Sequence, residues 1–294
     1  MNTATETAAL PRNSTTGRVR PFPVPPWVRA TMKVTSAISP PAATRLAQRL
    51  LFTPVRARVR DEERGVLASG ERFSLAAGGQ RVAGYAWGEG PTVLLAHGWG
   101  GHAGQMTPLV GPVVAAGFRA VAIDLPGHGE SEGSLSSLVH CAKAIAGAAA
   151  LFKPVRGLVA HSFGAAASTY AMSQGLPVGR AVFFAPPARF ESFWSRFQVG
   201  VGVPEEIMRR VMRRAESWLD VRFEGLAPVD LAPRMTTPLL VLHDPQDREM
   251  PFEDGAELAG RWPGAEIRPA QGRGHLRILR DEGCVGEAVE FLAA

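Results

Sequence analysis

Cysteine is scarce in this chain of 294 residues, which contains only Cys141 and Cys284. The two lie far apart, and neither has a nearby partner at the spacing of a metal site, so a disulfide framework and a cysteine-based metal site are both unexpected. Both fall in stretches with helical character, where a small buried thiol is the usual outcome. The sequence therefore predicts a fold stabilised by its core, with no metal and no cofactor.

Long apolar runs are missing as well. No stretch approaches the ~18 apolar residues that a membrane-spanning helix needs. The N-terminus lacks the apolar core of a secretory signal, because Pro11, Asn13 and Ser14 interrupt it early. We therefore expect no stable insertion into a membrane and a cytoplasmic location.

Basic charge is confined to the N-terminal region. The whole chain has a formal net charge of +5, but residues 1–64 hold eleven Arg or Lys against four acids, which leaves the remainder at −2. The body of the protein thus lacks the positive field that gathers phosphate groups, and a nucleic-acid partner is not expected.

The N-terminal quarter differs in composition from the rest. Residues 1–40 are rich in Thr, Pro, Ala and Arg, with four prolines just before Trp27, and predict an extended or partly disordered basic arm. Residues 41–69 predict a short amphipathic helix, between Pro41 and Pro54, followed by a linker. We expect this helix to dock on the body of the protein, an anionic surface being the alternative.

From residue 71 onward, short apolar runs alternate with helical stretches. Two strands over 71–77 and 80–87 flank Gly78-Gly79, a hairpin signal. Six further runs predict buried strands, at 92–96, 119–123, 157–160, 181–185, 239–242 and 265–269. This alternation predicts an α/β fold over residues 70–294, with a mostly parallel sheet covered by helices on both faces. An insertion at about 189–235 carries apolar residues at helical spacing and predicts a small helical cap.

The run at 157–160 ends in a motif that suggests a nucleophile. In Ala160-His161-Ser162-Phe163-Gly164 a serine lies between small residues, as required for a tight turn that exposes the hydroxyl between a strand and a helix. Glycine is usual at both flanks, so Ala160 is a mild departure. A match of this kind is weak evidence by itself, and its value depends on what lies elsewhere in the chain.

Two glycine-bearing loops follow earlier strands. His97-Gly98-Trp99-Gly100-Gly101 follows the strand at 92–96, and such a turn can aim a backbone N–H at a developing oxyanion. We expect the amides of Trp99 and Phe163 to form the oxyanion hole. The second loop, from Asp124 to Ser131, is rich in turn-forming residues, so we assign Asp124 and His128 a structural role.

A serine nucleophile needs a base and a carboxylate that orients the base, and both follow downstream. Two acids, Asp244 and Asp247, come after the strand at 239–242; Asp247 is preferred because Asp244 is closer to the strand and suited to capping the turn. His275 follows the last strand behind the flexible Gly274 and is the predicted base. His102, His140 and His243 are assigned to surface or packing positions, and His161 to shaping the turn around Ser162.

The order Ser162, Asp247, His275 is the one associated with the α/β-hydrolase arrangement. With His97-Gly98, Pro126-Gly127-His128-Gly129 and Gly274-His275 on the expected strand ends, the sequence resembles the α/β-hydrolase superfamily over roughly residues 70–294, in its serine esterase, lipase and small-peptidase branches. The resemblance implies an eight-stranded, mostly parallel sheet and a cap inserted after the sixth strand. It also implies acyl-enzyme chemistry, because relatives with an aspartyl intermediate carry an aspartate where this chain has Ser162.

These observations predict a carboxylesterase-like serine hydrolase with the catalytic triad Ser162, Asp247 and His275, acting on a small-molecule acyl substrate. An acyltransferase with the same triad is an alternative, because the triad does not determine whether water or another nucleophile releases the acyl group. A ligand-binding protein on a hydrolase fold is a third hypothesis, since fold alone does not establish function. Neither the acyl chain length nor the oligomeric state follows from the sequence.

Overall fold

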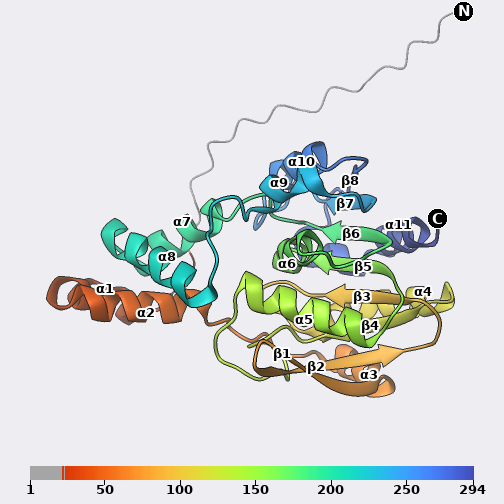
Figure 1. Ribbon diagram of the computed structural model, residues 1–294, viewed down its shortest axis with the longest axis horizontal. Helices are drawn as coiled ribbons and strands as arrows, with labels where there is room; N and C mark the ends of the chain where they lie inside the picture. The colour runs from red at the N-terminus through yellow and green to blue at the C-terminus, as the bar shows by residue number, and fades with distance from the viewer. Residues whose placement is uncertain (1–21, 23) are drawn as a thin grey trace, which may run out of the picture.

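A computed structural model describes Phe22 and residues 24–294; the remainder of the predicted arm lies outside the described residues. Eight strands form one sheet in the order β1-β2-β4-β3-β5-β6-β7-β8 (Figure 1). Strands β1 and β2 form an antiparallel hairpin, β2 pairs antiparallel with β4, and the other pairs are parallel. The bounds are β1 Glu71–Ala77, β2 Gln80–Trp87, β3 Thr92–Ala96, β4 Arg119–Ile123, β5 Val155–His161, β6 Arg180–Phe184, β7 Leu239–His243 and β8 Glu266–Pro269.

The predicted fold class is confirmed, and the predicted strands match the observed ones to within two residues at each end. Strands β3, β6 and β7 are almost entirely buried, because helices cover both faces of the sheet. The hairpin turn falls at Gly78 and Gly79, whose φ angles of 58° and 79° lie in the left-handed region that glycine adopts without strain.

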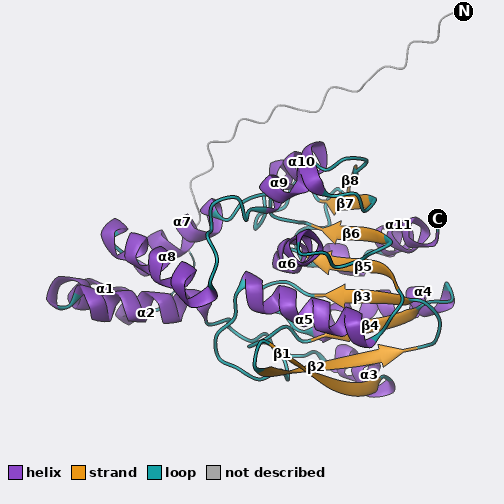
Figure 2. Cartoon of the chain, viewed as in Figure 1, coloured by secondary structure: helices purple, strands orange, loops and turns teal. Residues whose placement is uncertain are grey.

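Helices pack on the two faces of the sheet in separate layers (Figure 2). One apolar core joins the sheet to α5, α6, α9 and α10. A second core joins the other face to α3, α4 and α11. The bounds are α3 Asp61–Ser69, α4 Val110–Ala115, α5 Leu138–Leu151, α6 Phe163–Ser173, α9 Pro228–Leu231, α10 Phe252–Arg261 and α11 Glu282–Ala293.

Four helices form a separate lobe beyond the sheet, which we call the helical lobe (Figure 1). Helices α7 (Glu191–Val201) and α8 (Glu205–Leu219) come from the insertion after β6, and α1 (Pro26–Ile38) and α2 (Pro40–Phe52) come from the N-terminal region. Their shared core includes Met32, Ala47, Phe197 and Val211, each almost or fully buried. The helical lobe is therefore built from two segments that are distant in the sequence.

The N-terminal region is more ordered than its composition predicts. Residues 26–38, assigned to an extended arm, form α1, because Pro26 lies at the first helical position, where its fixed φ and missing N–H favour a helix. The amphipathic helix is present as α2 and packs on α8. None of the helices in the described part of the chain is both long and apolar enough to cross a bilayer.

The predicted linker contains a third helix that belongs to the body of the protein. Helix α3 begins with three acids, which favour the positive end of a helix dipole. Its Glu63 is buried and forms an ion pair with Arg280 at 2.7 Å. The indole N–H of Trp87 donates to the carbonyl of Val66 at 3.1 Å. These contacts tie α3 to β2 and to the C-terminal part of the chain.

Candidate active site

Ser162 lies at the sharp turn between β5 and α6. Its φ of 49° and ψ of −120° are sparsely populated for a residue with a side chain, so the turn is strained. Two backbone hydrogen bonds hold it: Ser162 N donates to the carbonyl of Phe184 on the neighbouring strand at 2.9 Å, and Ala165 N donates to the carbonyl of Ser162 at 2.9 Å. The surrounding structure thereby fixes a serine at the rim of a cavity.

The small residues that flank Ser162 have different reasons to be small. A Cβ on Gly164 would lie 2.4 Å from the carbonyl oxygen of His97 and 2.7 Å from that of Ala96, so only glycine fits at this crossing. Ala160 is fully buried, and its methyl group packs in the core beneath α5 and α6 rather than lining the cavity. The departure from glycine at Ala160 therefore leaves the space around the serine unchanged.

The structure brings Asp247 and His275 into direct contact. Asp247 Oδ2 accepts a hydrogen bond from His275 Nδ1 at 2.7 Å. Its other oxygen, Oδ1, accepts from the backbone N–H groups of Glu249 at 2.7 Å and Met250 at 3.0 Å. Burial opposes ionisation of Asp247, but the neighbouring His243 imidazole and the hydrogen bond from His275 outweigh burial and hold its pKa well below the ordinary value. Asp247 is therefore an ionised carboxylate fixed on both oxygens.

Asp244, the acid that the sequence analysis placed second, holds the loops around this pair. Its Oδ1 accepts from the backbone N–H groups of Gln246 at 2.8 Å and Gly272 at 3.2 Å, and its Oδ2 accepts from Gly274 N. The carboxylate thus ties the loop after β7 to the loop that carries His275. Because Asp244 accepts three hydrogen bonds from backbone amides, its role is to position these two loops.

Two buried histidines, His243 and His161, adjoin Asp247 and His275. His243 is fully buried; its Nε2 donates to the carbonyl of Met250 at 3.1 Å and lies 3.6 Å from Asp247 Oδ2. His161 Nε2 donates to the carbonyl of His275 at 2.9 Å. Burial lowers the pKa of His161 to about 3, and the neighbouring His275 adds to the shift, so His161 is a neutral donor. The sequence predicts a packing position for His243; its proximity to Asp247 was not predicted, because no spacing in the sequence indicates it.

The loop after β3 faces Ser162. His97 Nδ1 donates to the carbonyl of Gly98 at 2.7 Å, and its Nε2 accepts from Leu125 N at 3.0 Å. Burial lowers the pKa of His97 well below its ordinary value, which matches this neutral, bridging role. Within the described residues, the backbone N–H groups of Trp99 and Phe163 donate no hydrogen bond to the protein. Both residues line the cavity beside Ser162.

The loop from Asp124 to Ser131 is built as a support. Asp124 accepts hydrogen bonds from Ala103 N at 2.7 Å and from Glu130 N at 2.8 Å. His128 is buried, and its Nδ1 donates to the carbonyl of Pro126 at 2.9 Å. Its ring contacts the rings of His97 and Trp99 edge to face. The two side chains therefore fix the loop beneath Trp99, as their turn-rich surroundings predicted.

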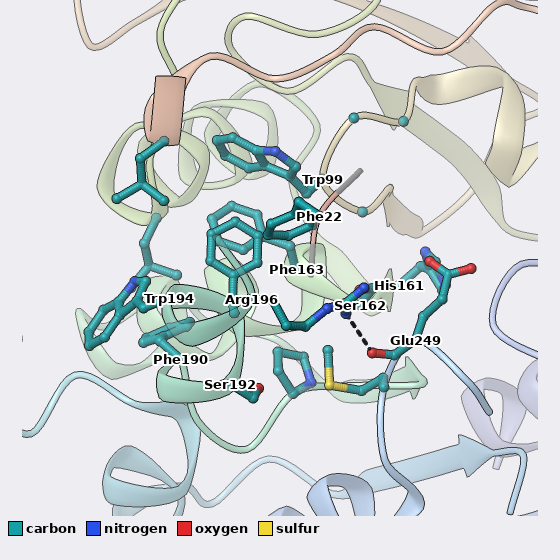
Figure 3. Close-up of a pocket in the computed structure, with 18 of the residues that line it drawn as sticks. Phe22, Trp99, His161, Ser162, Phe163, Phe190, Ser192, Trp194, Arg196 and Glu249 are labelled. Carbon is teal, nitrogen blue, oxygen red and sulfur yellow. Dashed lines mark hydrogen bonds between the residues drawn. The ribbon is translucent and has the colours of Figure 1, made fainter. Parts of the chain in front are cut away.

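A cavity of about 370 Å³ lies between the helical lobe and the carboxyl ends of the strands. Its walls are mainly aromatic and aliphatic, and Figure 3 shows Trp99, Phe163, Phe190 and Trp194 around Ser162. Polar groups at its edge are Arg196, whose Nη1 donates to the carbonyl of Glu249 at 3.0 Å, and Arg189, which pairs with Glu257 at 2.7 Å. The N-terminal region contributes walls that the sequence analysis did not assign: Phe22, Leu51, Phe52 and Val55.

Phe22 connects the N-terminal region to the cavity wall. Its backbone N–H donates to the carbonyl of Arg196 at 3.2 Å, its ring packs edge to face on Phe193, and the Arg196 guanidinium lies 5.0 Å from the ring centroid. A Cβ on Gly200 would lie 2.6 Å from the carbonyl oxygen of Phe22, so α7 approaches this segment closely. The aromatic wall thus combines Phe22, from the N-terminal segment, with residues of α7.

Comparison with known proteins gives a family match and a partial sequence match. A family model described as "Alpha/beta hydrolase family" matches residues 93–287. Over 44 residues, 15% of this chain, the sequence is 52% identical to the pimeloyl-[acyl-carrier protein] methyl ester esterase of Methylococcus capsulatus, and it spans 17% of that protein's length.

Solved structures show the same fold at low sequence identity. The Pyrococcus furiosus esterase Pf2001 aligns with a TM-score of 0.62 and 18% identity, covering 82% of this chain and 98% of that one. A membrane phospholipase A described as a bacterial virulence factor aligns with a TM-score of 0.60 and 19% identity, covering 90% of this chain and 95% of that one. At these identities the likeness concerns the fold alone.

Proposed function

Since this chain belongs to the alpha/beta hydrolase family, we propose that it is a serine hydrolase that cleaves a carboxylic ester, or a related acyl bond, through an acyl-enzyme intermediate. The observation that carries the proposal is the 2.7 Å hydrogen bond between Asp247 and His275 at the edge of the cavity that Ser162 lines. A serine hydroxyl becomes a nucleophile when an oriented imidazole accepts its proton. Ser162, His275 and Asp247 supply nucleophile, base and orienting carboxylate.

In the proposed reaction, Ser162 Oγ attacks the carbonyl carbon of the substrate as His275 Nε2 accepts the hydroxyl proton. Collapse of the tetrahedral intermediate releases the alcohol, which takes that proton from His275, and leaves the acyl group on Ser162. Water then attacks the acyl group, with His275 again as base, and the acid leaves. Asp247 holds the imidazole by its Nδ1–H and stabilises the imidazolium formed at each attack.

The oxyanion formed at each attack needs donors that are already in place. We assign this role to the backbone amides of Trp99 and Phe163, which are supported by their uncommitted N–H groups and by the position of Phe163 at the start of α6. Each such donor is worth about 3 kcal/mol of transition-state stabilisation. His97 supports the loop that carries Trp99 by bridging Gly98 and Leu125.

The walls of the cavity favour a hydrophobic acyl group of moderate size. Its volume of about 370 Å³ lies toward the lower end of the range for small-molecule sites. Its aromatic and aliphatic lining offers an acyl chain apolar contact on several sides. The cytoplasmic location stays a prediction.

Substitution of Ser162 tests this proposal, because it removes the nucleophilic hydroxyl and keeps the backbone. Ser162→Ala retains a Cβ at the strained φ, so the melting temperature should stay near that of the wild type, while hydrolysis of a short-chain nitrophenyl ester should fall by about 10³-fold or more. A fluorophosphonate should label the wild-type protein and leave this variant unlabelled. The matched control is Ser192→Ala, another serine that lines the cavity, which should keep both labelling and turnover. Undiminished turnover in Ser162→Ala would refute the proposal.

A further inference from the structure

A second, open hollow lies where α2 and α8 meet the loop between β4 and α5. Figure 1 shows the two helices side by side. Each helix contributes three residues at spacing i, i+3 and i+4, which place them on one face of the helix. The residues that line the hollow are Arg45, Gln48 and Arg49 of α2, Arg214, Ser217 and Trp218 of α8, and Ser134 and Leu135 of the loop. We call this hollow the arginine pocket.

The three arginines of the pocket have no neutralising partner in the described part of the chain. The guanidinium groups of Arg45, Arg49 and Arg214 are exposed and make no ion pair and no hydrogen bond with any described residue. The segment that contains two of them supplies no acid, because residues 24–60 hold seven arginines and lysines and no aspartate or glutamate. Like charges around one hollow repel one another, and a bound anion relieves this repulsion.

The nearest carboxylates are bound by other arginines. Glu205 and Glu206 lie about two turns of α8 before the pocket. They pair with Arg209 and Arg210 at 2.5–3.0 Å. Glu132, which precedes the loop of the pocket, pairs with an arginine of β2 at 3.3 Å. These acids are therefore committed elsewhere.

A neighbouring hollow on α8 shows the usual balance of charge. It is lined by Arg213 and Arg222, but also by Glu216 and Asp220. Glu216 lies 3.8 Å from Arg222 and accepts a hydrogen bond from a backbone N–H at 2.9 Å. Two cations thus face two carboxylates there, whereas no acid lines the arginine pocket. The excess of positive charge belongs to one hollow of the described surface.

Trp218 gives the arginine pocket a fixed aromatic wall. Its ring packs edge to face on Phe52, with centroids 5.4 Å apart, and lies 5.2 Å from the ring of His140. The side chain is nevertheless 39% exposed. An indole held in this way offers a flat apolar surface beside the three cations.

We propose that the arginine pocket binds the phosphate groups of a small, soluble phosphorylated molecule, with the organic part of that molecule against Trp218. Guanidinium groups present paired N–H donors that match phosphate oxygens, and three of them favour a ligand with two or more negative charges over a monocarboxylate. The hydroxyls of Ser134 and Ser217 line the same hollow and are further donors. The proposal does not depend on the chemistry at Ser162.

Calorimetric titration of the full-length protein tests this proposal, with inorganic pyrophosphate as the probe. We expect one pyrophosphate per chain, with acetate bound at least about tenfold more weakly, because a single charge engages fewer of the arginines. Raised salt should weaken the binding, since the pocket is open to solvent. Pyrophosphate should also raise the melting temperature, because it binds the folded protein. No binding of pyrophosphate, or equal binding of acetate, would overturn the proposal.

Vesicles distinguish a soluble ligand from a phosphate on a lipid headgroup. We expect pyrophosphate to bind in the absence of lipid, and the protein to stay unbound in flotation with vesicles of phosphatidylcholine and phosphatidic acid. Flotation with these vesicles that pyrophosphate abolishes would show that the pocket holds a lipid phosphate, and would refute a soluble ligand.

Substitutions locate the site. The double variant Arg49→Gln/Arg214→Gln should bind pyrophosphate at least about tenfold more weakly and keep its melting temperature in the absence of the probe, because both side chains are exposed. Arg45→Gln alone should show a smaller loss in the same direction. The matched control is Arg213→Gln, which removes the same charge from the neighbouring hollow and should change the affinity less than about twofold. Wild-type affinity in the double variant, or an equal loss in the control, would refute the assignment to this pocket.

Discussion

Three buried imidazoles surround the turn at Ser162, and each joins backbone segments instead of carrying charge. His97 links the loops after β3 and β4, His161 holds the carbonyl of His275, and His128 holds the loop under Trp99. Burial lowers the pKa of all three, so all are neutral near pH 7. The folded protein thus keeps neutral three groups that the unfolded chain protonates below about pH 6.5.

This arrangement predicts a loss of stability in mild acid. Burial lowers the pKa of His128 to about 4, so between pH 6.5 and 4 the unfolded state binds a proton that the folded state does not, and stability falls as the pH falls. The contribution of His128 approaches roughly 3 kcal/mol at the acid end of that range. His128→Gln, which cannot titrate, should show a shallower decrease of the melting temperature from pH 7 to pH 4.5. A decrease as steep as in the wild type would contradict this account.

The sequence predicts which acid contacts His275 but not the groups that hold this acid in place. Asp247 was preferred because it lies in the loop proper, and it is the acid whose Oδ2 meets His275 Nδ1. The roles of His243 and Asp244 depend on how two loops approach one another in space. Such contacts leave no periodic or spacing signal, so they required the structure. The catalytic assignments themselves stay predictions until the substitution of Ser162 is measured.

At the scale of elements, the segment before α3 fastens the helical lobe to the loops of the site. The Arg56 guanidinium donates hydrogen bonds of 2.9–3.2 Å to the carbonyls of Gly127, Gly129, Ser131 and Gly133. The next residue, Ala57, donates its N–H to the carbonyl of Gly100 at 2.9 Å. One short stretch therefore braces the loop after β4 and the loop after β3, and the latter lines the cavity.

Arg56→Lys should show what this brace contributes. A lysine keeps the charge but cannot direct five N–H donors in a planar fork, so most of the four bonds are lost, at a cost of about 1–2 kcal/mol in the free energy of unfolding. If Trp99 supplies an oxyanion donor, kcat should fall several-fold with little change in KM, because Gly100 adjoins Trp99. Chemical denaturation and steady-state kinetics measure the two effects. The control is Arg58→Lys, exposed two residues away; the same loss there would contradict the assignment.

Elements were predicted well where the pattern is local. Short apolar runs bounded by turn residues marked six strands, and the Gly78-Gly79 hairpin signal marked β1 and β2. The inner strands β3, β6 and β7 bury both of their faces, as their apolar runs predict. The strand at 265–269 was predicted to be buried, but β8 lies at the edge of the sheet and has no buried residue. Helix α1 was missed because prolines and small polar residues resemble an extended arm. Its apolar positions Val28 and Met32 make sense only against α7 and α8, which lie more than 150 residues later.

At the scale of the whole molecule, the helical lobe is one packed unit made from two parts of the chain. Removal of residues 1–38 would delete α1 and Phe22, expose apolar residues of α2 and α7, and open one wall of the cavity. We expect this deletion to make residues 191–219 sensitive to limited proteolysis and to raise the KM for longer acyl esters. Removal of residues 1–20, which keeps α1 and Phe22, is the control and should preserve resistance. Equal resistance of both truncated proteins would mean that α1 contributes little to the lobe.

The divided origin of the helical lobe also bears on how the chain is made. Helices α1 and α2 leave the ribosome roughly 140 residues before α7 begins. At ordinary elongation rates of 5–20 residues per second, their apolar sides wait about ten to thirty seconds for the helices that cover them. During that time Met32, Ala47 and Leu51 are open to incorrect contacts, and a chaperone that shields apolar surface would serve the nascent chain best in this interval. Helices α1 and α2 are thus synthesised well before the helices that complete their packing.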